Sequence, residues 1–367
     1  MLKHRLKHRL KHRLKHRLKG WLRVVFGRTV WHTGAWRLFD AYMPRRLTIL
    51  AGHCVGPARG LPRDLTISEG RLLALLQALG ANFDWCTIGD GVKSIDDRLK
   101  GRSLVALSFD DGYRDNHEVL LPLLDQTCAK ATIFLEGAPL SQNKVSWSHK
   151  YFWLIHVAKV APKQIAEELR GVAGSAKGFE MLIAAVAAPE QDREYRIKKV
   201  LKYQCDADQR NAAMQRIFLG HGGVESELRN ALYLSKEQIL KLRRAGVELG
   251  GHTEGHEVLS TLLPDQALLQ VATGRRSMEA LLGSDLSTCF AYPFGRHWDF
   301  DESTKHAVIA AGYNIAVTTH AGVYQGKEDK LALGRTMLSE DLPIYQVMME
   351  ACGANQWLRR FGIELAQ

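Results

Sequence analysis

Short apolar runs alternate with amphipathic segments along most of the chain. The apolar runs are rich in Val, Ile, Leu and Phe and have the length of buried strands. They are Leu47–Ala51, Trp85–Ile88, Leu104–Phe109, Ala131–Leu135, Val247–Leu249, Cys289–Tyr292 and Asn314–Thr319. The amphipathic segments predict helices at Ser68–Leu79, Asn116–Thr127, Ser235–Ala245, from Pro264 or Asp265 to Leu282, and Phe300–Ala311. Strands that alternate with helices predict an α/β fold with a parallel sheet, either open or closed into a barrel.

The alternation is interrupted between residues 141 and 234. This stretch is rich in Ala, Glu, Lys and Gln and has few β-branched runs, so it predicts a helical insertion. Residues 44–140 and 235–367 are then the two parts of one α/β domain. Ahead of them, residues 20–43 have the apolar spacing of one amphipathic helix or of two short ones, which end before Pro44.

The net charge of +11 comes from one end of the chain. Residues 1–19 repeat the tetrapeptide LKHR and hold nine of the 50 Lys and Arg residues but no acid, which leaves 41 basic against 39 acidic residues elsewhere. A basic excess can indicate a nucleic-acid or membrane partner, but here it concerns the tail alone. The tail is either a repeat expansion or early start codon, or a basic arm for phosphate-rich surfaces. We expect no nucleic-acid partner for the body of the protein.

The cysteines and the hydropathy of the chain indicate where in the cell the protein is located. All six cysteines stand singly, with no CxxC pair, which is typical of buried thiols in a reducing compartment. No apolar run reaches the roughly 18 residues of a transmembrane helix, and the basic start lacks the unbroken apolar stretch of a signal peptide. We therefore expect a cytoplasmic protein and leave open its contact with the inner face of a membrane through residues 1–40.

Two adjacent carboxylates follow the strand Leu104–Phe109, in the sequence FDDG. Asp110 and Asp111 are therefore expected at the carboxyl end of a strand, where parallel α/β folds keep their active sites. Adjacent acids repel each other, so a functional pair needs something to hold it. Taken alone, DDG is more often a turn and the N-cap of the following helix.

Two histidines four residues apart, His252 and His256, follow the strand Val247–Leu249. On one helical turn their imidazoles face the same way, as two metal ligands from one segment must. With an added Asp they would make a facial triad that leaves positions open for water and substrate, which is typical of a catalytic zinc site. By itself, the HxxxH spacing also occurs by chance on surface helices.

A third cluster, FAYPFG, includes the end of the strand Cys289–Tyr292. Pro293 removes one amide and restricts the chain, so we expect the N–H of Tyr292 to point into a site as an oxyanion donor. An ordinary strand-to-loop turn with buried aromatic side chains would explain the same residues.

Together and in this order, the three clusters resemble the motifs of the polysaccharide deacetylase (NodB-homology) family. FDDG is similar to its first motif, HTEGH to its second and YPFG to its third, and the likeness covers residues 47–135 and 234–338. ILAGHCV, which contains His53, and the later GRT resemble a branch found in bacterial surface-polysaccharide pathways. The resemblance implies an irregular (β/α) barrel with a helical insertion, and a role in exopolysaccharide biosynthesis.

The same resemblance implies a role for each motif residue. Asp110 is the expected general base, and Asp111, His252 and His256 are the expected ligands of a divalent metal, with zinc the expected ion. The chemistry of these residues agrees, because a metal and a base can activate water for attack on an amide carbonyl while the Tyr292 amide stabilises the oxyanion. The implied partner is an N-acylated carbohydrate substrate.

Two features of the family pattern are absent. No Arg opens the third motif, where Ser287 and Thr288 stand, although in much of the family an Arg there holds the base. The late Leu-x-His that supplies the general acid is replaced by LALGRTML, which contains Arg335. His320, just after the strand Asn314–Thr319, is the nearest candidate acid.

The sequence thus predicts a metal-dependent hydrolase that removes an N-acyl group, N-acetyl above all, from an amino sugar of a poly-, oligo- or lipid-linked saccharide. Three alternatives stay open: a catalytically silent homologue that binds glycans, a deformylase of a lipid-linked amino sugar, and a protein that uses its basic arm on nucleic acid or anionic membrane. Trp298, Phe294 and Tyr292 could form a sugar-stacking wall. Nothing in the sequence indicates an oligomeric state.

Overall fold

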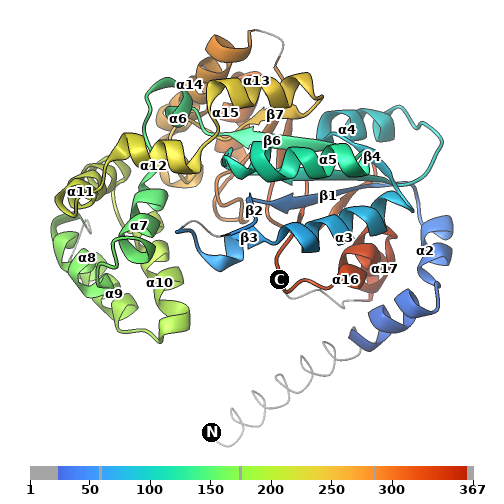
Figure 1. The fold of residues 1–367 in the computed structure, drawn as a ribbon, viewed down its shortest axis with the longest axis horizontal. Helices are drawn as coiled ribbons and strands as arrows, with labels where there is room; N and C mark the ends of the chain where they lie inside the picture. Colours follow the sequence, from blue (N-terminus) through green and yellow to red (C-terminus); the bar gives the residue numbers. More distant parts are fainter. Residues whose placement is uncertain (1–23, 58–59, 173–175, 284–285, 362–367) are drawn as a thin grey trace, which may run out of the picture.

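The computed structural model describes residues 24–57, 60–172, 176–283 and 286–361. Its main element is a nine-stranded, mostly parallel sheet of order β10-β1-β5-β6-β7-β8-β9, in which β4 also pairs with β5 and β11 with β1 (Figure 1). The strands are β1 (Leu47–Gly52), β4 (Asp84–Cys86), β5 (Leu104–Phe109), β6 (Ala131–Leu135), β7 (Glu248–Gly251), β8 (Cys289–Ala291), β9 (Ile315–Val317), β10 (Val323–Tyr324) and β11 (Thr336–Met337). A small second sheet pairs β2 (Cys54–Val55) with β3 (Thr66–Ile67).

The segment that contains β11 closes the sheet into an irregular barrel. On one side β11 pairs in parallel with β1, and on the other Leu333 forms a parallel bridge with Val317 of β9. β1, β5 and β6 are buried at every residue, as parallel strands covered on both faces must be. The predicted fold, an irregular (β/α) barrel, is therefore confirmed.

Helices cover the sheet, and their ends follow from side-chain caps. Ser68 caps one helix by accepting from the Arg71 amide, and Ser235 with Gln238 forms a capping box at another. The helices around the barrel are α2 (Trp36–Tyr42), α3 (Glu69–Gly80), α4 (Ile88–Asp96), α5 (Leu121–Thr127), α13 (Lys236–Arg244), α14 (Pro264–Leu282), α15 (Glu302–Ala310), α16 (Ile344–Ala351) and α17 (Ala354–Arg360), with η2 (Asn116–Leu120) running into α5. Within the described ranges, no helix combines the length and the apolar character needed to span a membrane.

Some element boundaries differ from those predicted. The strand expected at Trp85–Ile88 ends at Cys86, because Thr87 caps α4, a helix that the apolar pattern did not reveal. The segment expected at residues 20–43 is described from residue 24, as a helix over residues 24–32 followed by α2. Gly34 separates the two with a φ of +73°. The LKHR repeat of residues 1–19 lies outside the described residues.

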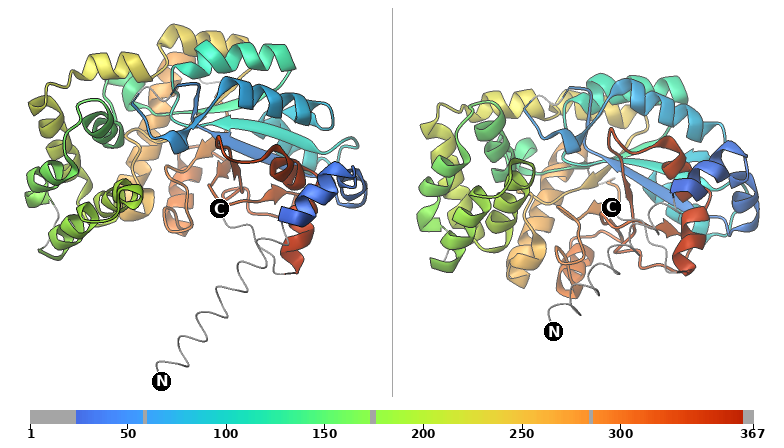
Figure 2. Two further views of the ribbon diagram at one scale, coloured as in Figure 1. Left: turned by 60° about the horizontal axis from the view of Figure 1, so that its bottom comes forward. Right: turned by 90° about the horizontal axis from the view of Figure 1, so that it is seen from below.

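The region between residues 141 and 234 is helical and packs around a second hydrophobic core, which Cys54, Leu61 and Tyr113 of the barrel part join. It follows α6 (Ala138–Ser141) and contains α7 (Trp147–His156), α8 (Pro162–Glu168), α9 (Ala176–Val186), α10 (Glu190–Tyr203), α11 (Ala207–Gly220) and α12 (Glu225–Leu232). Its core includes Trp147, Leu182, Leu201 and Phe218, which are all buried. This helical insertion forms a lobe beside the barrel in each view of Figures 1 and 2.

Candidate metal centre and active site

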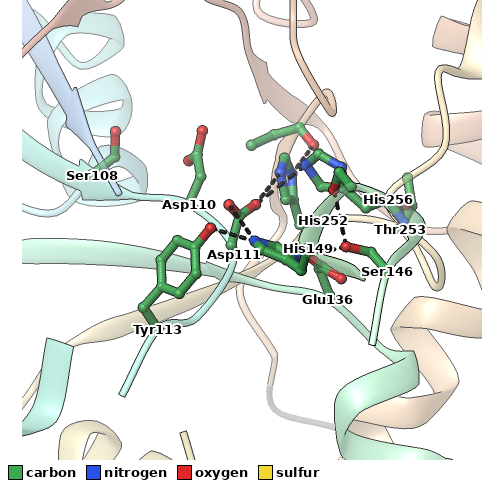
Figure 3. A network of polar contacts seen from close by, with 12 residues as sticks. Ser108, Asp110, Asp111, Tyr113, Glu136, Ser146, His149, His252, Thr253 and His256 are labelled. Carbon is green, nitrogen blue, oxygen red and sulfur yellow. Dashed lines mark hydrogen bonds and ion pairs between the residues drawn. The ribbon is translucent and has the colours of Figure 1, made fainter. Parts of the chain in front are cut away.

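The loops that follow β5 and β7 bring the predicted metal ligands together. Asp111 comes from the first loop, and His252 and His256 come from the second. Oδ1 of Asp111 lies 3.3 Å from Nε2 of His252 and 3.2 Å from Nε2 of His256. All three side chains are buried, and Figure 3 shows both imidazoles turned toward the Asp111 carboxylate.

The hydrogen bonding of this group fits a bound cation. Nδ1 of His252 lies 2.7 Å from the Ala291 carbonyl, which makes it the protonated nitrogen and leaves the Nε2 lone pair facing Asp111. Oδ1 of Asp111 is buried and has no hydrogen-bond partner among the described residues. Two imidazoles and one carboxylate that converge on a point form the donor set of a divalent metal, and they leave coordination positions for water and substrate.

The backbone of the ligand loops is strained. Asp111, Thr253 and His256 have φ values of +70°, +64° and +58°, in the left-handed region that non-glycine residues rarely adopt. Thr253 supports its loop by accepting a hydrogen bond from the His256 amide at 3.0 Å. Such strain persists only where the surrounding structure imposes it, and it is concentrated at functional sites.

Burial and mutual attraction set the protonation of the three groups. Burial alone raises the pKa of Asp111, but His256 and His252 outweigh it and hold this pKa well below its ordinary value. Burial lowers the pKa of His256. It acts the same way on His252, yet the attraction of the Asp111 carboxylate and the charge of Asp110 outweigh it and raise that pKa. Asp111 is therefore ionised and attracts a cation.

The neighbouring carboxylate, Asp110, is held by Arg335. The guanidinium donates from Nη1 to Oδ1 at 2.7 Å and from Nη2 to Oδ2 at 2.8 Å, and both side chains are buried. Arg335 is itself fixed by the Thr318 carbonyl, 2.8 Å from its Nε. Burial raises the pKa of Asp110, but the charge of Arg335 and its hydrogen bonds outweigh this, and the pKa lies below its ordinary value.

Sequence reasoning missed this role of Arg335. The arginine was expected ahead of the third motif, and its absence there left the base without a partner. Arg335 stands instead one residue before β11, the strand that closes the barrel beside β1. The available signal was the GRT sequence at the position where the general-acid histidine was missing.

The expected role of the Tyr292 amide is wrong in this structure. The amide donates to the Val317 carbonyl at 3.2 Å, so it continues the pairing of β8 with β9 and does not point into the site. The pairing of β8 with β9 ends at Pro293, which has no N–H to donate. We expected it to end one residue earlier, at Tyr292. The Tyr292 ring is buried and stacks on Phe300, with ring centroids 4.5 Å apart, so it is not part of an exposed sugar wall.

The amide of Phe294 is better placed. Phe294 has a φ of +62°, and its ring packs edge-on against His256 with centroids 4.7 Å apart. No hydrogen bond of its N–H is found within the described ranges. Phe294 is thus a strained residue beside a metal ligand with an amide available to a ligand.

The expected proton donor, His320, is turned elsewhere. Its ring faces His297, at a centroid distance of 5.7 Å, and Phe300, at 6.3 Å. By contrast His53, directly after β1, is close enough to act electrostatically on both Asp110 and Asp111. β1 pairs with β5 up to Gly52 and Phe109, so His53 and Asp110 leave the sheet side by side.

An aromatic rim lies directly after the third motif. Trp298 is 43% exposed, and its indole N–H donates to the Tyr203 hydroxyl at 2.7 Å. Arg296 donates to the hydroxyl of Tyr195, which is also exposed. Both tyrosines belong to α10, so the insertion and the segment after the third motif share this rim.

Comparison with known proteins supports the motif assignment. The family model described as polysaccharide deacetylase matches residues 97–171 and 208–316, half of the chain. Over 107 residues the chain is 28% identical to YxkH of Bacillus subtilis, a match that covers 29% of this chain and 37% of that protein.

Two solved structures resemble the whole fold. The Streptococcus pyogenes deacetylase PplD, solved in complex with acetate, has a TM-score of 0.55 at 16% identity, over 84% of this chain and 99% of that chain. IcaB from Ammonifex degensii has a TM-score of 0.52 at 16% identity, over 84% and 97% of the two chains. At these identities the likeness shows the fold. With the family match and the converging motif residues, it shows that this chain belongs to the polysaccharide deacetylase family.

Proposed function

We propose that this protein is a metal-dependent N-deacetylase that acts on an amino sugar of a poly-, oligo- or lipid-linked saccharide. The observation that carries the proposal is that Asp111, His252 and His256 meet beside a second carboxylate, Asp110, which Arg335 holds. Zinc is the ion that this donor set favours. When bound, the ion would polarise the amide carbonyl and make water more acidic.

Asp110 is the group that takes the proton from the attacking water. Both of its oxygens accept hydrogen bonds from Arg335, but each carboxylate oxygen keeps a second lone pair for the water. The ion pair keeps Asp110 ionised and fixes the orientation of its carboxylate. A base that is held in place near its proton is what general-base catalysis requires.

The N–H of Phe294 is the proposed oxyanion donor. It replaces the Tyr292 amide in this role because it has no carbonyl partner in the described structure, whereas the Tyr292 amide bonds to Val317. A fixed backbone N–H stabilises developing negative charge without reorganising during the reaction. The packing of the Phe294 ring against His256 fixes this residue next to a metal ligand.

His53 is the proposed proton donor to the leaving amine. Arg335 occupies the sequence position where the family has its acid, and an arginine cannot give up its proton in a protein. The half-buried imidazole of His53 lies at the same end of the barrel as Asp110. A general acid and a general base on neighbouring strand ends can reach opposite sides of one amide bond.

Removal of the metal should abolish acetate release. The full chain would be treated with a chelator and assayed on N-acetylglucosamine oligomers, then supplied again with Zn²⁺. We expect loss of activity and its recovery, and no recovery for Asp111→Ala at the same Zn²⁺ concentration. Undiminished release by the chelated protein would contradict the proposal, and glycan binding without turnover would favour the silent homologue.

The two candidate acids can be separated by substitution. We expect His53→Ala to lower kcat by about 10²-fold, the lower range for a lost general acid. We expect His320→Ala to leave kcat within a few-fold of wild type, because its ring packs against His297 and Phe300. A large loss for His320→Ala with none for His53→Ala would return the role to His320. Steady-state kinetics on the same oligomers give the answer.

The location of the enzyme stays a prediction. A cytoplasmic protein that contacts the inner face of a membrane through residues 1–40 would suit a lipid-linked substrate. Fractionation of cells that express the full chain, compared with a chain lacking residues 1–19, would test that contact.

A further inference from the structure

The structure assigns a role to the helical insertion: we propose that His149, on α7, is a positioning residue that holds the metal ligand Asp111 in its binding orientation. This inference rests on the metal site of the proposed function. The sequence predicted a helical insertion between the two parts of the barrel domain, and this insertion reaches the metal centre. His149 is buried, and Figure 3 shows its ring beside the Asp111 carboxylate, which His252 and His256 also approach.

The two oxygens of Asp111 face different parts of the protein. Oδ1 faces the Nε2 atoms of His252 and His256. Oδ2 lies 3.9 Å from Nε2 of His149. The side chain of His149 thus lies against the second oxygen, where it opposes rotation of the carboxylate. Asp111 then presents one defined oxygen to the metal.

His149 is itself held from several directions. Its Nδ1 lies 2.6 Å from the Ser146 hydroxyl and 2.6 Å from the Tyr233 hydroxyl. Its Nε2 bonds to the hydroxyl of Tyr113. The ring also contacts Tyr113 and Tyr233 edge-on, with centroid distances of 5.4 Å and 5.3 Å. An imidazole with this many contacts has little freedom to move.

The same contacts brace the strained turn that carries Asp111. Asp111 and Gly112 both have a φ of +70°, and the chain after them pairs with the exit of the insertion. The Leu234 amide donates to the Gly112 carbonyl at 3.0 Å, and Tyr113 forms an antiparallel bridge with Tyr233. His149 joins these two tyrosines. The beginning and the end of the insertion therefore hold the turn together.

The insertion also contacts the histidine loop. Arg210 of α11 forms a buried ion pair with Glu257, the residue after His256, with Nη2 and Oε2 2.5 Å apart. The side-chain amide of Asn211 donates from Nδ2 to the other carboxylate oxygen of Glu257, Oε1, at 2.8 Å. Both segments that supply metal ligands are thus fixed to the insertion. This arrangement agrees with a positioning role for the insertion and not with a lobe that is independent of the site.

A second metal ion is the competing interpretation. Asp111, Glu136 and His149 also place one ligand atom each within 4.8 Å of the others. Both nitrogens of His149, however, already bond to hydroxyl groups. We therefore assign His149 to positioning and not to coordination.

The test is the Zn²⁺ affinity of the full chain, measured by competition with a chromophoric chelator. We expect His149→Phe to weaken binding about 10- to 100-fold, the range for residues that orient metal ligands. His149→Gln should recover most of the affinity, because its amide can replace the Nε2 contact. Tyr233→Phe, which removes one hydroxyl and keeps the ring, should weaken binding several-fold and serves if His149→Phe does not fold. His156→Phe, at the C-terminal end of the same helix, where His156 pairs with Glu194, is the matched control and should bind as wild type does.

Three results would overturn the inference. They are an unchanged affinity in folded His149→Phe and Tyr233→Phe, an equal loss in the His156→Phe control, or two Zn²⁺ ions per wild-type chain that fall to one in His149→Phe. Failure of the proposed function looks different. A wild-type chain that binds no Zn²⁺ removes the metal centre itself, whereas Zn²⁺ binding that depends on His149 without acetate release removes the activity and leaves the positioning role in place.

Discussion

Replacing Asp110 by Asn is expected to lower kcat by about 10²- to 10⁴-fold, the contribution of a positioned general base. The change keeps the size of the side chain but removes its charge and one of its two acceptor oxygens. Arg335 then donates to only one oxygen, and the amide group cannot take a proton from water. Because Asp110 is not in the predicted ligand set, the affinity for Zn²⁺ should stay within a few-fold of the wild-type value.

Two measurements on the Asp110→Asn variant are needed together. One is kcat at saturating substrate, from acetate release, and the other is the dissociation constant for Zn²⁺. Asp125→Asn, at an exposed position of α5, is the control for loss of a carboxylate elsewhere. A variant that keeps its rate excludes Asp110 as the base. A variant that loses Zn²⁺ binding would make Asp110 a ligand and change the assignment of the pair.

Replacing Arg335 by Met should have the largest effect on stability. It leaves the Asp110 carboxylate buried without its cation, and the loss of one partner of a buried ion pair typically costs about 3–5 kcal/mol. Urea unfolding at neutral pH measures this change in the free energy of unfolding. Arg102→Met, which removes an exposed guanidinium paired with Asp84, is the control and should change stability by less than about 1 kcal/mol.

The pH dependence of the Arg335→Met variant has a definite sign. In the wild type the pKa of Asp110 lies below its ordinary value despite burial, because of Arg335. The pair therefore adds stability above the ordinary carboxyl pKa, and this stability is lost as the pH falls through the pKa of the folded state. Without Arg335, burial raises the pKa of Asp110. The stability deficit of the variant should then shrink as the pH falls.

The activity of the same variant should shift with pH in a matching way. A base with a raised pKa is protonated over more of the acidic range, so the acidic limb of kcat/KM should move to higher pH. Arg335→Lys keeps a positive charge but lacks the planar fork that matches both oxygens of Asp110, so it should shift the limb less. An unchanged acidic limb in Arg335→Met would mean that Asp110 does not control it.

Much of the barrel could be predicted from local patterns. A run such as Leu104–Phe109 has no polar face, so it has to lie in a sheet that is covered on both sides. α4 was not predicted because its start depends on Thr87, a capping residue directly after a short strand. The strand β11 was not predicted either, since two residues between loops carry no periodic pattern.

The sequence by itself determined which chemistry stands at the strand ends. Asp110, Asp111, His252 and His256 each follow an apolar strand closely, and parallel strands bring their carboxyl ends to one side. Neighbours along the chain were enough to predict these four residues because the motif and the strand that positions it are adjacent in sequence.

Only the tertiary structure decided how those residues are held. It placed Arg335 on Asp110, 225 positions away along the chain, it occupied the Tyr292 amide with Val317, and it brought His149 of the insertion beside Asp111. The physical reason is that these contacts depend on the register between distant strands and on how the insertion packs against the barrel. No spacing of residues within one segment carries that information.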